Sequence, residues 1–213
     1  MTSSDSGENS QDATDAGGEG ADGPGEDASV AVLLDYLPHG RPDDDRPRYQ
    51  KSPMAYALGV DEFRLLELTL ADDADVSVGD RVVVEPSSAR ETVTRVRDIE
   101  YEGLSNNAIS ELEYVVEDIV EDDEQRFVDF FNDAQPITLR LHQLNLLPGI
   151  GKKLRNNILD ERKRGPFESF EDLTERISGL HNPRQILVDR IMEELREEDL
   201  KYRTFVTHGR DGD

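Results

Sequence analysis

The sequence contains no cysteine, little lysine and no long apolar run. The absence of cysteine excludes disulfide bonds, a thiol nucleophile and a zinc site with cysteine ligands. No stretch approaches the roughly 18 apolar residues of a membrane-spanning helix, and residues 1–28 lack the apolar segment of a secretory signal. We therefore expect a soluble cytoplasmic protein with no membrane partner.

Positive and negative charges are far from balanced, with 48 acidic and 24 basic residues and a net charge of -24. Such a chain repels phosphate on average, which excludes broad attraction to nucleic acid or anionic lipid. Any phosphate contact must therefore be local. Lysine supplies only 5 of the basic residues, and carboxylates occur along the whole chain. This balance keeps a protein hydrated in concentrated salt and predicts a halophile's surface, with an ordinary acidic protein as the alternative.

The first hundred residues divide into a tail and a β-rich unit. Residues 1–28 carry eight carboxylates and no basic residue, so we expect a disordered acidic tail, with a tethered functional peptide as the alternative. Residues 29–101 contain five short strand-like runs, at 30–37, 54–60, 63–70, 79–86 and 91–101, without helical crossovers between them. These runs predict a small N-terminal β-barrel that is OB-like, the oligonucleotide-binding type.

Residues 102–133 are expected to form an acidic helical connector. The stretch 98–133 holds 13 acidic residues and one basic residue, Arg126. Its apolar residues recur at helical spacing: Leu112, Val115, Val116, Ile119 and Val120, then Phe127, Phe130 and Phe131. One face of this connector should pack on the barrel or on the segment after residue 133. The run "EDDEQ" lacks the loop pattern of a calcium hand, which favours a solvated turn over a metal site.

Residues 134–200 should form an all-α domain whose first part reverses the charge. The stretch 135–165 has seven basic and two acidic residues, a net charge of +5. Apolar residues predict one helix face at Ile137, Leu141 and Leu144 and a second at Ile150, Leu154 and Ile158. Between them, Pro148 and Gly149 should stop the first helix, and Gly151 should let the backbone turn sharply into the second. Two further amphipathic helices follow in 166–200, and 201–213 should be a C-terminal strand or tail.

Such a turn leaves the first amides of the second helix unpaired, with the helix dipole behind them, which makes an anion site from backbone. Nearby lysine and arginine side chains add mobile positive charge without contacting a base edge, so binding should be independent of sequence. The predicted nucleic-acid-binding residues are Gly149, Ile150, Gly151, Lys152, Lys153 and Arg155. A plain helical turn with surface lysines is the alternative, but it does not explain this local reversal of charge.

The stretch "LPGIGKKLRNNIL" resembles a helix-hairpin-helix motif, a nucleic-acid-binding element that does not read sequence. Arg155 departs from the motif, which usually has a small residue there. The stretch "LHNPRQILVDRI" has the same internal spacing, with Val188 in place of Arg155 and without the glycine pair, so we expect a degenerate structural partner. The fold class is then multidomain α+β, an OB-like barrel followed by a tandem helix-hairpin-helix domain at 134–200.

The order of barrel, acidic helix and "QPITLRLHQLNLLPGIGKKLRNNILDERKRGPFESFEDL" resembles an archaeal family, domain of unknown function 655. The resemblance covers nearly everything after residue 28. It implies an RNA-binding protein with an oligonucleotide-binding-like barrel, encoded among translation genes, and partners in the ribosome or RNA processing. It implies no activity, and RNA is favoured over DNA on this resemblance alone.

A second contact surface and two other classes of function stay open. Contacts on the barrel are expected at Arg46, Arg48, Tyr49, Lys51 and Tyr56, where bases could stack on tyrosine, or these residues only cover a barrel end. We expect no enzyme, cofactor or metal, because the four histidines are scattered and acidic pairs such as Asp72 and Asp73 follow from composition. The alternatives are a protein-interaction adaptor and a carboxylate-dependent nuclease.

Overall fold

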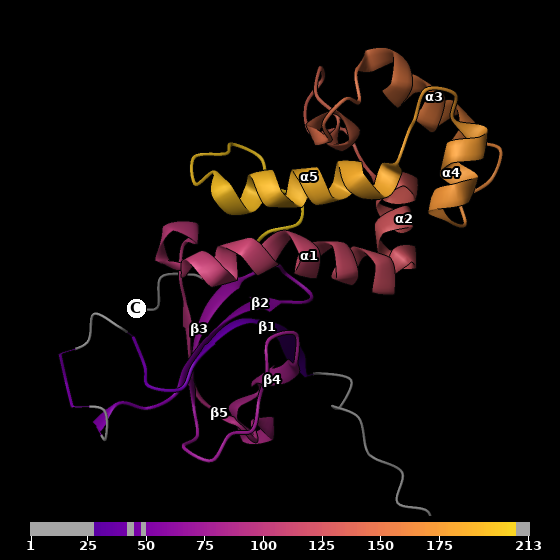
Figure 1. Cartoon of the computed structure of the whole chain (residues 1–213). Helices are drawn as coiled ribbons and strands as arrows, with labels where there is room; N and C mark the ends of the chain where they lie inside the picture. The colour runs from indigo at the N-terminus through magenta and orange to yellow at the C-terminus, as the bar shows by residue number, and fades with distance from the viewer. Residues whose placement is uncertain (1–27, 42–44, 48–49, 208–213) are drawn as a thin grey trace, which may run out of the picture.

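The computed structural model describes residues 28–41, 45–47 and 50–207. Five strands form one antiparallel sheet in the order β4-β1-β2-β3-β5 (Figure 1). Their bounds are Ser29–Leu37 for β1, Met54–Gly59 for β2, Leu65–Leu70 for β3, Arg81–Glu85 for β4 and Val93–Asp98 for β5. These bounds confirm the five predicted strands. The predicted acidic tail lies outside the described residues except for Ala28.

The sheet is buried on both faces, which explains the nearly continuous apolar runs of its central strands. Alternate residues of β1, β2 and β3 point to opposite sides: Val32 and Leu58 pack under helix α1, whereas Ala31 and Leu68 fill the inside of the curled sheet. The edge strands β4 and β5 come close together, but no ladder joins them in the described part of the chain. The sheet is therefore a half-barrel, and the closed barrel that we expected is not seen.

Helices α1 (Asn106–Asp122) and α2 (Glu124–Asp133) form the acidic connector, following short 3₁₀ turns at Ser87–Ala89 and Tyr101–Gly103. Ser105 begins α1 by accepting the Ala108 N–H at 3.1 Å. The same hydroxyl donates to the buried Asp35 carboxylate of β1 at 2.5 Å, which fixes α1 to the sheet. The predicted apolar spacing is confirmed, because Leu112, Val116 and their helical neighbours are buried against the sheet and α5.

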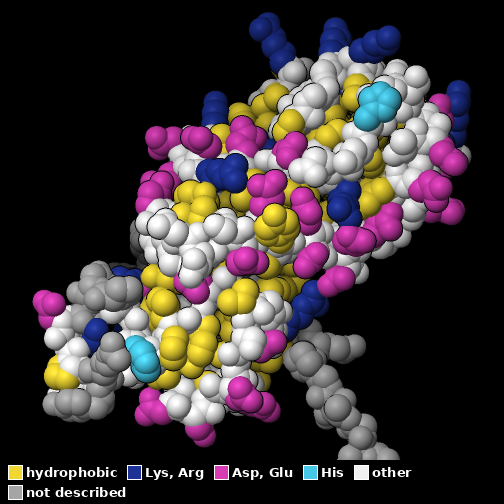
Figure 2. Space-filling view, viewed as in Figure 1, with side chains coloured by type: hydrophobic (Ala, Val, Ile, Leu, Met, Phe, Trp, Pro, Cys, Tyr) yellow, Lys and Arg dark blue, Asp and Glu magenta, His cyan; other side chains and the backbone are white. Residues whose placement is uncertain are grey.

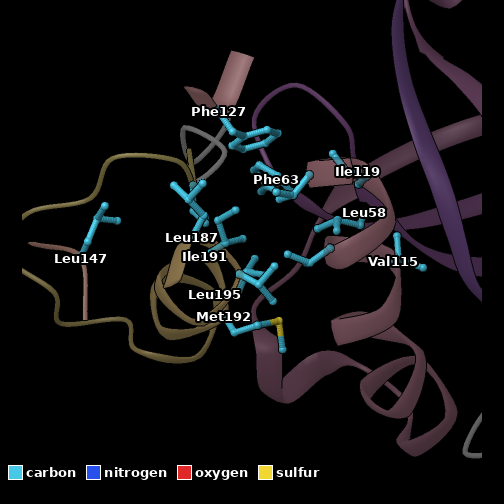
Figure 3. Packing of buried hydrophobic residues seen from close by; sticks show 14 of the residues in the cluster. Leu58, Phe63, Val115, Ile119, Phe127, Leu147, Leu187, Ile191, Met192 and Leu195 are labelled. Atoms are coloured by element: carbon cyan, nitrogen blue, oxygen red, sulfur yellow. The ribbon is translucent and has the colours of Figure 1, made fainter. Parts of the chain in front are cut away.

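The remaining helices are η4 (Gln143–Leu146), α3 (Lys152–Arg162), α4 (Phe170–Arg176) and α5 (Pro183–Arg196). Helix α1 lies between the sheet and α5 (Figure 1). One apolar cluster runs from the sheet through α1 into α5, where Leu187, Ile191 and Leu195 face the connector (Figure 3). The two predicted helices of 166–200 are confirmed as α4 and α5. No helix in the described ranges is both long and apolar enough to cross a membrane.

The predicted helix through Ile137, Leu141 and Leu144 is wrong. The hydroxyl of Thr138 accepts the backbone N–H groups of Arg140 (3.2 Å) and Leu141 (3.0 Å), which closes a turn in place of a helix. Only a short 3₁₀ helix, η4, precedes the glycines. The turn leaves Leu139 fully exposed at its tip.

Of the strand or tail expected at 201–213, the described part, which ends at residue 207, contains no strand. The Glu194 carboxylate of α5 is completely buried and accepts the N–H groups of Thr204, Phe205 and Val206 at 2.9–3.0 Å. Arg190, also buried, bonds Glu194 at 2.7 Å and the Tyr202 carbonyl at 2.6 Å. The side chains of Glu194 and Arg190 therefore make the hydrogen bonds to the backbone of 202–206 that a neighbouring strand would make in a sheet.

Candidate nucleic-acid interface

The 147–151 loop connects η4 to α3 and is anchored by two apolar side chains. Leu147 and Ile150 are 2% and 3% exposed, and the Ile150 N–H donates to the Leu147 carbonyl at 3.2 Å. Gly149 has φ +77°, a left-handed conformation that glycine adopts most readily. Gly151 has φ -77° and ψ 177°, which any residue can adopt. Our expectation that Gly151 provides the sharp turn is therefore wrong, because Gly149 provides it.

Helix α3 begins without a side-chain cap. Its N-cap is Gly151, whereas Ser105, Ser169 and Asn182 use their side chains to cap α1, α4 and α5. The first amides of α3 are therefore left for an external acceptor, and the helix dipole adds partial positive charge there. A Cβ at Gly151 would meet no atom within 4 Å, so the space in front of these amides is open. Backbone amides facing open space can receive an anion.

Asn145 of η4 ties the loop to Arg155 of α3. Its side-chain nitrogen donates to the Ile150 carbonyl at 2.9 Å, and its Oδ1 accepts from Arg155 Nη1 at 3.0 Å. The other Arg155 bonds go to the Asn156 amide oxygen. Arg155 is thus half-buried and turned toward η4, and these neutral partners leave its charge unbalanced. Sequence reasoning missed Asn145, since nothing in the pattern marks it.

Besides Arg155, three exposed cations near the loop lack an acidic partner within the described residues. Lys152, Lys153 and Arg140 are exposed and make no ion pair there. The other basic residues of this region are engaged: Lys163 and Arg164 pair with Asp160 and Glu161, and Arg162 binds carbonyls at the end of α2. Figure 2 shows Lys and Arg side chains gathered at the α3 end of the molecule, while acidic side chains cover the middle of this face.

A shallow depression of about 630 Å³ separates the loop from α5. The loop backbone forms one wall, and Asp189, Arg190 and Glu193 of α5 contribute to the other, where Arg190 is already paired with Glu193 and the buried Glu194. Two carboxylates repel phosphate, so an anion should reach the loop from the α3 side, where Lys152 and Lys153 lie. The depression therefore restricts the direction from which a polyanion can approach.

Residues 27–207 match the model of the family described as protein of unknown function (DUF655). The chain belongs to this family. It is 43% identical over 180 residues to an uncharacterized protein of Methanocaldococcus jannaschii, a match that covers 84% of this chain and 79% of the relative. It is also similar to a DUF655 protein of Archaeoglobus fulgidus whose crystal structure is known, with 42% identity and a TM-score of 0.76. That match covers 84% of this chain and 99% of the other.

The segment 180–191 of this DUF655 protein, which has the same internal spacing as 147–158, repeats one feature of its backbone, although α5 begins two positions earlier in the matched spacing than α3 does. Asn182 occupies the position that corresponds to Gly149 and is also left-handed, with φ +47°. Leu180 and Ile191 are buried as Leu147 and Ile158 are. However, the Asn182 side chain accepts the Gln185 N–H, and Pro183 follows it, so the start of α5 is closed. This segment offers no open amides comparable to those of α3.

The residues expected to form contacts on the barrel do not all lie on the surface. Arg48 and Tyr49 lie outside the described residues, and Arg46 is exposed. Lys51 Nζ lies 3.4 Å from the Arg41 carbonyl. Tyr56 is 6% exposed and belongs to the core under α1, so the prediction that a base stacks on it is wrong.

No cluster of three or more His, Asp or Glu side chains arranged to hold a metal ion occurs in the described ranges of this DUF655 protein. Asp72 and Asp73 lie exposed in a turn between β3 and β4. His142 is buried, and its Nδ1 accepts the Leu144 N–H at 3.2 Å. Burial, followed by the charges of Arg162 and Arg155, lowers the pKa of His142 below its ordinary value. The neutral imidazole thus acts as the cap of η4.

Proposed function

We propose that this protein binds nucleic acid without reading its sequence, with the 147–151 loop and the start of α3 acting as a helix-hairpin-helix phosphate site. One observation carries the proposal: in a chain of net charge -24, α3 begins without a side-chain cap beside Lys152 and Lys153, which make no ion pair with any residue that the structure describes. The half-barrel is then an oligonucleotide-binding-like companion module. RNA ahead of DNA, a cytoplasmic location and a non-enzymatic role belong to the same proposal.

The geometry supports binding of the phosphate backbone and gives no means of recognising bases. Backbone amides and lysine side chains recognise charge and the tetrahedral oxygens of phosphate, which every nucleotide presents. Among the residues that the structure describes, no aromatic side chain lines the depression beside the loop. The acidic surface elsewhere repels the same backbone, so contact requires a place where cations gather, as they do beside the loop. The preference for RNA is supported by the family resemblance alone.

The test replaces the two unpaired lysines by neutral residues. In Lys152→Gln with Lys153→Gln, binding of fluorescent single-stranded RNA, structured RNA and duplex DNA is followed by anisotropy over a series of KCl concentrations. We expect the affinity to fall about tenfold or more. The slope of log affinity against log salt should become shallower by about 0.7 for each lost contact on single strands.

A matched control removes the same charge directly after the other end of α3. In Lys163→Gln with Arg164→Gln, both replaced side chains are exposed and already paired with acidic neighbours. This control should bind almost as the parent does. If both double variants bind like the parent, the lysines make no contact with the nucleic acid, and the adaptor hypothesis takes its place.

We also propose that the protein operates in concentrated salt. Acidic side chains dominate the face shown in Figure 2, and lysine is scarce in the chain. Screening of carboxylate repulsion should raise the melting temperature as KCl increases from dilute to molar concentrations. A melting temperature that stays constant or falls over this series would support an ordinary acidic protein.

A further inference from the structure

A second group of cations lies on the half-barrel, away from the 147–151 loop. Arg95 and Arg97 of β5 stand opposite Thr69 and Glu67 of β3 in the antiparallel ladder, so their side chains share the outer face of the sheet. Arg41, from the segment after β1, reaches the same place and forms an ion pair with Glu67. We call Arg41, Arg95 and Arg97 the β5 arginine cluster.

One carboxylate serves two of these guanidinium groups. Glu67 accepts from Arg41 through Oε2 and lies 3.1 Å from Arg97 Nη2 through Oε1, with its side chain 17% exposed. Arg95 is exposed and makes no ion pair within the described residues. The neighbouring Asp98 points to the other face and binds Arg64 through both oxygens at 2.8 Å. Of the charged groups that line the recess described next, Arg95 and Arg97 are therefore opposed by Glu67 alone.

Arg95 and Arg97 line a recess of about 70 Å³ together with Glu67 and Thr69. This volume exceeds the roughly 15 Å³ that a cavity needs to hold one water molecule, so the recess has room for one small anion. Its lining is polar throughout and offers a peptide side chain no apolar wall. Guanidinium groups match the paired oxygens of phosphate and of carboxylate alike, and the proposed function supplies the phosphate.

We propose that the β5 arginine cluster binds a second phosphate group of a nucleic-acid chain, at the far end of the molecule from α3 (Figure 1). This inference rests on the proposed function for the class of ligand but not for the site, because the two groups of residues are separate. The region between them carries exposed carboxylates of α1 and α2, so the contacts form two points and not one continuous basic track.

The test uses Arg95→Gln with Arg97→Gln in the full chain, bound to a labelled uridine oligomer of about 40 nucleotides. Its affinity should fall about tenfold, and the log-log salt slope should become shallower by about 1.4, the value for two contacts on a single strand. Arg95→Gln alone should show about half of that change in slope. It removes no ion pair of the described structure, so it should leave the melting temperature unchanged.

The matched control is Arg81→Gln with Arg184→Gln, two partly exposed arginines paired with Asp122 and Glu121 on α1. It lowers the net charge equally and should bind like the parent. Equal loss in the control would assign the effect to overall charge and overturn the site, as would parent-like binding by both Arg95 variants. If inorganic phosphate competes as well as the oligomer at equal phosphate concentration, the site holds a free anion and the nucleic-acid assignment is overturned.

The lysine variants at 152 and 153 distinguish the two proposals. If only the lysine variants lose affinity, the loop site is supported and the β5 site is contradicted. If only the Arg95 and Arg97 variants lose affinity, the β5 site is supported and the loop site is contradicted. When both pairs are replaced together, the loss should exceed that of either pair alone.

Discussion

Arg155 and Asn145 form a hydrogen bond of 3.0 Å that joins α3 to η4 across the 147–151 loop. Asn145 also donates to the Ile150 carbonyl. Arg155 therefore supports the conformation of the loop through Asn145, and it adds positive electrostatic potential beside it. In the segment 180–191, which has the same internal spacing, the corresponding residue is the fully buried Val188, whose side chain packs there by apolar contact. The two segments therefore use different interactions at this position.

Replacement of Arg155 should affect both stability and binding. In Arg155→Gln the bond to Asn145 is lost and a positive charge disappears, so we expect about 1 kcal/mol of destabilisation together with weaker RNA binding. Chemical denaturation and anisotropy measure the two effects. Arg164→Gln is the control, since its surface pair with Glu161 should contribute less than about 1 kcal/mol. Unchanged stability in Arg155→Gln would show that Asn145 holds the loop without it.

The two glycines of the loop should respond differently to substitution. Gly149→Ala forces a side chain into the left-handed region and should cost about 1–2 kcal/mol of stability. Gly151→Ser fits the backbone and caps α3, which should raise the free energy of unfolding by a few tenths of a kcal/mol. Its hydroxyl, however, would accept a backbone N–H that the proposal assigns to phosphate. We therefore expect Gly151→Ser to be at least as stable as the parent but weaker in binding. Parent-like RNA affinity in this variant would exclude the α3 amides from the contact.

The buried Glu194 should be a main determinant of stability. Glu194→Gln leaves Arg190 without its buried counter-charge and weakens the bonds to the backbone of 204–206, which should cost about 3–5 kcal/mol. Glu193→Gln is the control, one residue away and 44% exposed, with an expected cost below about 1 kcal/mol. Equal unfolding midpoints in denaturant for the two variants would contradict this assignment.

Acid should loosen the segment around η4 through His142. Its folded pKa lies below the ordinary 6.5, so the unfolded chain binds a proton more readily. The free energy of unfolding should therefore be unaffected by His142 above about pH 7 and should fall as the pH drops below 6.5. His142→Asn retains a capping oxygen without titrating, so its stability should depend less on pH between about 7 and 5. Parallel curves for parent and variant would remove His142 from this role.

Much of the fold follows from periodicity that can be read in the chain. The strands and helix α1 were predictable, because burial of Leu112, Val116 and Ile119 needs only regular spacing. The spacing of Ile137, Leu141 and Leu144 is equally regular, yet the Thr138 hydroxyl competes for the amides that a helix would need. The spacing of apolar residues gives no information about this competition for backbone N–H groups.

The candidate site was predictable as a set of residues but not as an arrangement. The Gly-Ile-Gly run and its lysines indicate an anion site, whereas the roles of Asn145 and Gly149 depend on how η4 approaches α3. Glu194 could not be recognised among 48 carboxylates, because its burial results from tertiary packing alone. Arg95 and Arg97 alternate along β5, but the contact with Arg41 requires the folded sheet.

Helix α1 packs on the sheet with one side and on α5 with another, within a single apolar cluster. The half-barrel and the α3 end therefore cannot move relative to each other without breaking that core. The distance between the β5 arginine cluster and the 147–151 loop is thus fixed. A linear polymer gains the second contact only once it is long enough to span that separation. Affinity plotted against oligomer length should accordingly rise in one step at a threshold length, and the Arg95→Gln with Arg97→Gln variant should show no step.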